Sequence, residues 1–143
     1  MKIQLILIFF LTLILGSCTT TEEIKNDYHN LAMDVYIAYS LEIDDDEIKI
    51  TKDGQDYVYI FRIPDKGIAL EDLIEIQLDD ETTLIEKEEF ENGDGAVFND
   101  KERGDFFEYR IQVGESWYRC KAGVYGPTGP SIKMIRSMRP SGG

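Results

Sequence analysis

The sequence predicts an α+β fold, with one N-terminal helix packed on a mostly antiparallel sheet of about six or seven strands. Three observations support this prediction. Apolar residues recur at helical spacing over residues 21–40, alternating apolar and polar residues follow, and short turn-forming sequences separate the alternating runs. We expect an open sheet curved around the helix. A small barrel, with the helix as its plug or lid, is the alternative topology.

The predicted helix covers about residues 21–40. Thr20 and Glu23 stand at the spacing of a capping box, in which each side chain bonds the backbone N–H of the other residue. The apolar stripe of this helix would cover one face of the sheet. It consists of Ile24, Tyr28, Leu31, Val35 and Tyr39.

Alternation and turn residues predict the strands. Asp53-Gly54 and Gly114-Glu115 are expected to be tight turns, each of which joins two alternating runs into a hairpin. Residues 88–104 are acidic and contain glycines, which predicts an irregular loop. The expected strands cover residues 48–52, 57–63, 73–78, 82–87, 106–113, 116–125 and 132–138.

The first eighteen residues have the pattern of a secretory signal. Lys2 is followed by an apolar stretch and then by Leu15-Gly16-Ser17-Cys18. This ending resembles the lipobox of bacterial lipoproteins. The resemblance implies that fatty acyl chains are attached to Cys18 and that the chain is cut between Ser17 and Cys18. Residues 1–17 would then be the signal peptide, and residues 18–143 a single α+β domain.

The resemblance also implies a location in the bacterial cell envelope. The apolar stretch Ile3 to Leu15 is shorter than the roughly 20 residues that a membrane-spanning helix needs. The protein would therefore be held at the membrane by the lipid on Cys18. Thr19 stands where enterobacterial lipoproteins carry an aspartate for retention in the inner membrane, so the outer membrane is favoured over the inner one.

Acidic residues dominate the part after the signal peptide, which has 14 Lys and Arg against 28 Asp and Glu. This balance argues against nucleic acid as a partner, because binding to phosphates depends on Lys and Arg. Residues 18–100 hold 24 of the acids and only 6 of the bases. We expect either an acidic face that steers a basic protein partner or a surface that serves solubility. The acidic turn at Asp44, Asp45 and Asp46 is the predicted part of such a face.

The predicted strand at residues 116–125 has two different faces. If Tyr118 and Cys120 point into the core, then Trp117, Arg119 and Tyr125 point outward, because successive strand residues face opposite ways. Trp, Tyr and Arg are the residues most enriched at interface hot spots. This patch is therefore a candidate partner-binding site, unless a second layer or the loop at 88–104 covers it.

The sequence offers little catalytic chemistry. His29 is the only histidine and is expected at the surface or its boundary, which argues against a catalytic triad and against a zinc site. Cys120 is expected to be a small buried residue; a catalytic thiol is the alternative. Asn92-Gly93-Asp94-Gly95 with Asn99-Asp100, or the turn Asp44 to Glu47, could bind calcium or be solvated turns. We expect neither an enzyme nor a cofactor.

These observations favour a non-enzymatic binding module on the cell envelope. The lipid on Cys18 would attach this module to the membrane. Its protein partner would be basic, as for an inhibitor or immunity-type lipoprotein. The alternative is a structural accessory subunit of an envelope complex that binds through the strand of Trp117.

Overall fold

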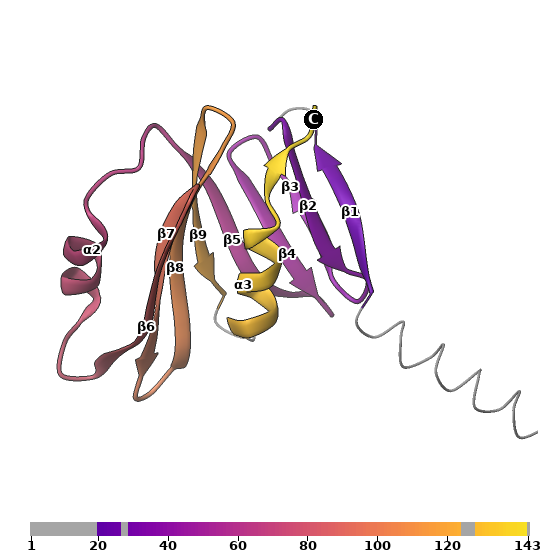
Figure 1. The fold of residues 1–143 in the computed structure, drawn as a ribbon. Coiled ribbons are helices and arrows are strands. Elements are labelled where there is room, and N and C mark those ends of the chain that lie inside the picture. Colours follow the sequence, from indigo (N-terminus) through magenta and orange to yellow (C-terminus); the bar gives the residue numbers. More distant parts are fainter. Residues whose placement is uncertain (1–19, 27–28, 124–127, 143) are drawn as a thin grey trace, which may run out of the picture.

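The computed structural model describes residues 20–26, 29–123 and 128–142. It contains a three-stranded sheet of order β1-β2-β10, a seven-stranded sheet of order β3-β4-β5-β9-β8-β7-β6, and two short helices (Figure 1). All neighbouring strands are antiparallel. The bounds are β1 Thr21–Asn26, β2 Leu31–Tyr36, β3 Ser40–Ile43, β4 Glu47–Lys52, β5 Gln55–Ile63, α2 Leu70–Gln77, β6 Thr82–Phe90, β7 Gly93–Asp100, β8 Gly104–Val113, β9 Ser116–Ala122, α3 Thr128–Arg136 and β10 Arg139–Pro140.

The prediction of an N-terminal helix is wrong, and with it the predicted fold class. Residues 21–36 form the hairpin of β1 and β2 instead. Three of the four steps in the apolar stripe are steps of four, which fit a period of two as well as a period of 3.6. The one step of three, from Tyr28 to Leu31, spans the β1–β2 connection. In β2, Leu31, Met33 and Val35 are buried at strand spacing.

Two predicted hairpins are confirmed. Strands β4 and β5 meet at Asp53 and Gly54, whose φ angles of 54° and 77° belong to the left-handed region that such a tight turn requires. Strands β8 and β9 meet at Gly114, which has a φ of 61°. These two hairpins lie side by side, because β5 pairs with β9 in the middle of the large sheet.

The prediction of an irregular loop at residues 88–104 is wrong. This segment contains the whole of β7, which pairs with β6 on one side and with β8 on the other. Its glycines are needed for packing. A side chain at Gly93 would overlap the backbone of Arg110, and one at Gly95 would overlap the ring of Tyr109. The same residues that are typical of a loop therefore belong to a buried strand.

The predictions of strands at 73–78 and 132–138 are also wrong, because residues 73–77 belong to α2 and residues 132–136 to α3. In α2 the buried residues Leu70, Leu73 and Ile74 have the spacing i, i+3, i+4, and acidic residues occupy its first turn. In α3 the buried residues are Ser131, Met134 and Ile135, which have the same spacing.

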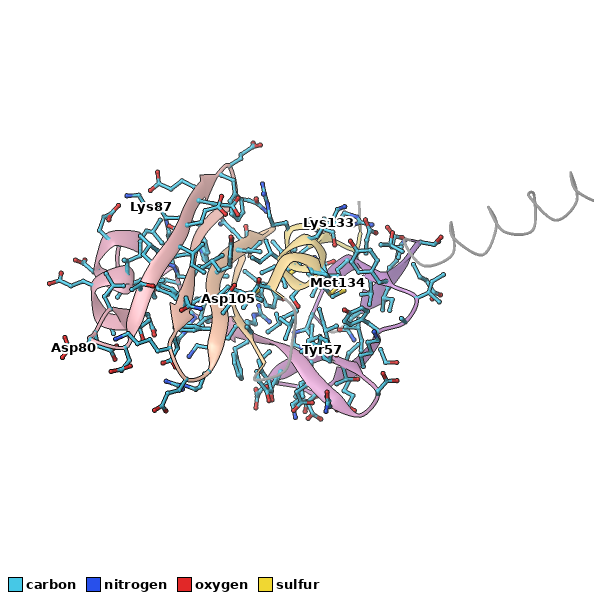
Figure 2. The ribbon with its side chains drawn as sticks, turned by 90° about the horizontal axis from the view of Figure 1, so that it is seen from below. Tyr57, Asp80, Lys87, Asp105, Lys133 and Met134 are labelled. Atoms are coloured by element: carbon cyan, nitrogen blue, oxygen red, sulfur yellow. The ribbon has the colours of Figure 1, made fainter. Side chains whose placement is uncertain are left out.

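The main core lies on one face of the seven-stranded sheet. There α3 and the three-stranded sheet cover the buried residues of β4, β5, β8 and β9 (Figures 1 and 2). Helix α2 packs on the opposite face, against Ala96, Phe98 and Phe106. The two helices therefore lie on opposite faces of one sheet, and only part of the second face is covered.

Cys120 lies in the main core, with an exposed fraction of 0%. Its burial raises the pKa of the thiol, so little of the reactive thiolate is present near neutral pH. We expect Cys120 in the folded protein to resist alkylation by iodoacetamide at pH 8 and to react fully after unfolding in urea. A mass-spectrometric time course measures this. Rapid alkylation under native conditions would show that the site is open.

Candidate functional site

The second face of the seven-stranded sheet is uncovered over β4, β5 and β9. The register of the strands brings Lys49 beside Tyr59, Tyr59 beside Lys121, and Phe61 beside Arg119. We call this surface the open face. It consists of Lys49, Tyr59, Phe61, Trp117, Arg119 and Lys121, all of which are partly exposed.

The structure places Trp117 and Arg119 on one face, as the alternation predicted. Tyr118, between them, is 1% exposed and donates a hydrogen bond to the carbonyl of His29 at 3.0 Å. Trp117 is half-buried, and the ammonium of Lys66 lies 6.0 Å from its ring centroid. Tyr125, the third predicted residue of the patch, lies outside the described residues. Lys66 was missed, because no sequence pattern links it to β9.

Aromatic and cationic side chains alternate across the open face. The rings of Tyr59 and Phe61 stack with their centroids 6.4 Å apart, and the ammonium of Lys49 lies 5.9 Å from the centroid of Tyr59. The hydroxyl of Tyr59 donates to Asp56 at 2.9 Å, and this hydrogen bond is the main reason why the pKa of Tyr59 is raised. The strand pattern around Tyr59 was visible in the sequence, but its place beside β9 follows only from the sheet order.

Buried ion pairs form the border of the open face towards α2. Asp94 on β7 accepts two hydrogen bonds from Arg110, at 2.7 and 3.0 Å, and pairs with Lys66 at 2.6 Å. The side chains of Asp94 and Arg110 are only 2% and 3% exposed. Arg110 also donates to the carbonyls of Lys66 and Ile68. Asp94 is thus paired with the chain's own cations and buried in β7, whereas the sequence left calcium binding and a solvated turn as the alternatives for this residue.

A second buried carboxylate, that of Glu108, holds Arg119 in place. The Nε of Arg119 donates to one oxygen of Glu108, and Gln77 of α2 donates to the other at 3.2 Å. Within the described residues, the remaining guanidinium nitrogens of Arg119 have no hydrogen-bond partner, and its side chain is 39% exposed. A groove of about 320 Å³ adjoins them, lined by Ile63, Lys66, Ile68, Leu73, Ile76 and Arg119 among others. This arrangement can bind apolar groups beside hydrogen-bond acceptors.

The predicted acidic turn lies at one end of the open face. Asp44, Asp45 and Asp46 connect β3 to β4 and are exposed, as expected of a solvated turn. The next residue, Glu47, pairs with Phe61. The three acids therefore flank the open face, without contacting Trp117 in the contacts described.

His29 differs from its expectation as a surface or boundary residue. It is 4% exposed, and its Nε2 donates to the carbonyl of Asp44 at 3.0 Å. This bond ties the β1–β2 turn to the acidic turn.

Among residues 20–26, 29–123 and 128–142, no group of three or more His, Cys, Asp or Glu side chains is close enough to hold a metal ion. Within the same residues, both helices are too short to cross a lipid bilayer. Cys18 and the predicted signal peptide lie outside the described part of the chain.

No family model matches the sequence, and no curated protein matches it. Among solved structures, the chain is similar to a crystal structure from Bacteroides thetaiotaomicron VPI-5482, with a sequence identity of 11% and a TM-score of 0.49. The similarity covers 84% of the present chain and 48% of the Bacteroides chain. The present chain therefore spans about half the length of the Bacteroides chain.

Proposed function

We propose that this chain is a lipid-anchored binding module of the bacterial cell envelope that docks a protein partner on the open face. The observation that supports it most directly is the composition of this face. Trp117, Tyr59, Phe61 and Arg119 are residue types that dominate the binding energy of protein interfaces, and they share one uncovered sheet surface. The strands beneath them are paired on both sides, so docking costs little ordering of the backbone.

The charge of the chain supports a partner with a net positive charge. The part after the signal peptide has a net charge of −14, and Asp44, Asp45 and Asp46 are exposed beside the open face. Such a field speeds the encounter with a basic protein, whereas Trp117, Tyr59 and Phe61 hold the complex once it has formed. The cations of the open face, Lys49, Arg119 and Lys121, would then lie against acidic or polar groups of that partner. An inhibitor or immunity-type lipoprotein that binds a basic protein would need both the negative field and the aromatic residues of the open face.

Trp117→Ala should speed dissociation of the complex by about tenfold or more, since a central aromatic hot spot contributes roughly 2 kcal/mol or more. Reversal of Asp44, Asp45 and Asp46 to lysine should instead slow association, with little effect on dissociation. The partner would first be captured from envelope extract on the full-length protein. Binding kinetics over a salt series would then be measured for both variants.

Ile37→Ala is the matched control, because Ile37 is 58% exposed and lies outside the open face. It should leave both rate constants unchanged. If the association rate changes neither with salt nor with the lysine reversals, the result would favour the structural accessory subunit over the basic-protein inhibitor. Wild-type kinetics for Trp117→Ala would exclude the open face as the docking site.

A further inference from the structure

The groove beside Arg119 continues the open face towards α2. In the strand register, Ile63 of β5 lies opposite Trp117, and Phe61 lies opposite Arg119. Ile63 and Arg119 also line the groove. The segment between β5 and α2 crosses the sheet and supplies further groove residues (Figure 1). The groove is therefore part of the docking surface proposed above, and its lining restricts what that surface can bind.

Arg119 is fixed at the groove by a buried carboxylate. Its Nε donates a hydrogen bond to Glu108, whose side chain is only 3% exposed. Gln77 of α2 donates to the other oxygen of Glu108 at 3.2 Å, so Glu108 is held in turn. Among the described residues, the two terminal nitrogens of the guanidinium have no hydrogen-bond partner. A guanidinium held in this way presents a preorganised pair of donors, which a carboxylate matches with two parallel hydrogen bonds.

The other charged side chains of the groove already have partners within the fold. Arg110 directs its donors to Asp94 and to two backbone carbonyls. Lys66 pairs with Asp94 at 2.6 Å but is 43% exposed, so a second positive charge stands at the rim. The exposed acid of the lining, Asp65, accepts a hydrogen bond from the backbone N–H of Gly67 at 2.8 Å. The donors left over in the groove therefore belong to one cation, with another cation beside it.

Apolar side chains form much of the remaining lining, namely Ile63, Ile68, Leu73 and Ile76. A ligand that fits must therefore join an apolar group closely to a carboxylate. The last residue of a protein chain does so by itself, because its α-carboxylate and its side chain are attached to the same carbon. An internal Asp or Glu would need a second residue for the apolar contact. The groove, of about 320 Å³, is at the small end of the range for ligand pockets, which favours a single residue.

From the fixed arginine, the second cation and the apolar lining, we propose that the groove binds the carboxyl-terminal residue of the protein partner. The α-carboxylate lies on Arg119, and an apolar side chain lies against the isoleucines. This inference rests on the proposed function, since it names the group that the same site recognises. A partner of net positive charge can carry such a terminus, because only one carboxylate is needed.

Short peptides test the groove directly. The full-length protein in phosphatidylcholine nanodiscs would carry isotope-labelled isoleucine methyl groups for NMR. Ile63, Ile68 and Ile76 then report the groove, and the exposed Ile37 reports a surface outside it. The probe is acetyl-Gly-Ser-Gly-Leu with a free carboxylate. We expect saturable shifts of the groove methyl signals, with a dissociation constant in the millimolar range, because a single residue offers few contacts.

Three altered peptides separate the parts of this proposal. The same peptide with a terminal amide should bind about tenfold more weakly, because charge-assisted hydrogen bonds are lost. Glycine in place of the terminal leucine should weaken binding by about fivefold, since it removes apolar area from the contact. Acetyl-Gly-Leu-Glu-Gly-amide, which has an internal acid and no terminal carboxylate, should bind as weakly as the terminal amide.

The double variant Glu108→Gln, Arg119→Gln should weaken binding of the leucine peptide by about tenfold. It removes the buried carboxylate together with its partner, so no unpaired charge remains inside the fold. An unchanged Ile37 methyl signal would show that the variant is folded. Arg62→Gln is the matched control, because Arg62 is exposed and precedes Ile63 on β5, so that it faces away from the groove. It should leave the affinity unchanged.

The inference is wrong if the groove methyl signals do not shift. It is also wrong if the terminal amide or the internal acid binds as tightly as the free carboxylate, or if the folded double variant binds normally. These results would leave the proposed function standing, because that function is tested by the partner's kinetics with Trp117→Ala. Wild-type kinetics of the partner with Trp117→Ala would instead reject the open face as its docking site, whatever the peptides do.

Discussion

Arg110→Met should lower the free energy of unfolding by about 3–5 kcal/mol, the cost of breaking a buried ion pair by removing one partner. The arginine holds Asp94 through two hydrogen bonds and also binds two carbonyls of the loop before α2. Without it, the carboxylate of Asp94, only 2% exposed, keeps one cation, Lys66. The urea midpoint of the purified protein in a mild non-ionic detergent measures the loss.

Two variants make this prediction specific. Lys87→Ala removes an ion pair that also links the sheet to α2, but its partners are 51% and 68% exposed, so the cost should stay below about 1 kcal/mol. The double variant Arg110→Met, Asp94→Leu should be more stable than Arg110→Met alone, because no uncompensated carboxylate remains buried. A double variant no better than the single one would show that the carbonyl contacts, and not the charge of Asp94, account for the loss.

The hairpins were predictable because their determinants are local. Asp53-Gly54 and Gly114 supply the positive φ that a tight turn needs, and the flanking residues alternate with a period of two. The alternation around Trp117 also gave the correct faces of β9, since a single buried residue, Tyr118, fixes the orientation of its neighbours. These features depend on a few adjacent residues and not on the rest of the fold.

The wrong predictions have a common physical cause, which is that the same sequence pattern fits two different kinds of secondary structure. Steps of four residues suit both a helix and a strand, so the stripe from Ile24 to Tyr39 could not distinguish them. Gly93 and Gly95 look like loop residues, yet the glycines are required because Arg110 and Tyr109 of β8 pack closely against them. That contact is between different strands, so the composition of residues 88–104 does not indicate it.

The site was predictable only in part, for the same reason. Trp117 and Arg119 lie on one strand, so their common face could be deduced. Phe61 and Lys66 come from other parts of the chain and reach them through the pairing of β5 with β9 and through the ion pair with Asp94. No spacing within the sequence encodes these distances.

Cys18→Ala should abolish lipid attachment and leave the precursor uncut. The thiol of Cys18 is the group to which the lipobox resemblance assigns the lipid, and alanine cannot replace it. Two or more acyl chains hold a protein at a membrane nearly irreversibly, because each buried methylene contributes about 0.8 kcal/mol. Labelling with a radioactive fatty acid, followed by a gel and membrane fractionation, measures attachment and processing together. Label on the Cys18→Ala variant, or normal processing of it, would refute the lipoprotein assignment.

Cys120→Ala is the matched control for this experiment. Cys120 is the only other cysteine of the chain and is fully buried, so its loss should leave the label and the processing unchanged. The labelling result also bears on where the folded domain lies, because β1 begins only a short distance along the chain from Cys18. Strand β1 begins at Thr21, three residues after Cys18, and three extended residues span only about 10 Å. If Cys18 carries the lipid, the folded domain would therefore be held close to the membrane surface, with its β1 end towards the bilayer and α2 away from it (Figure 1).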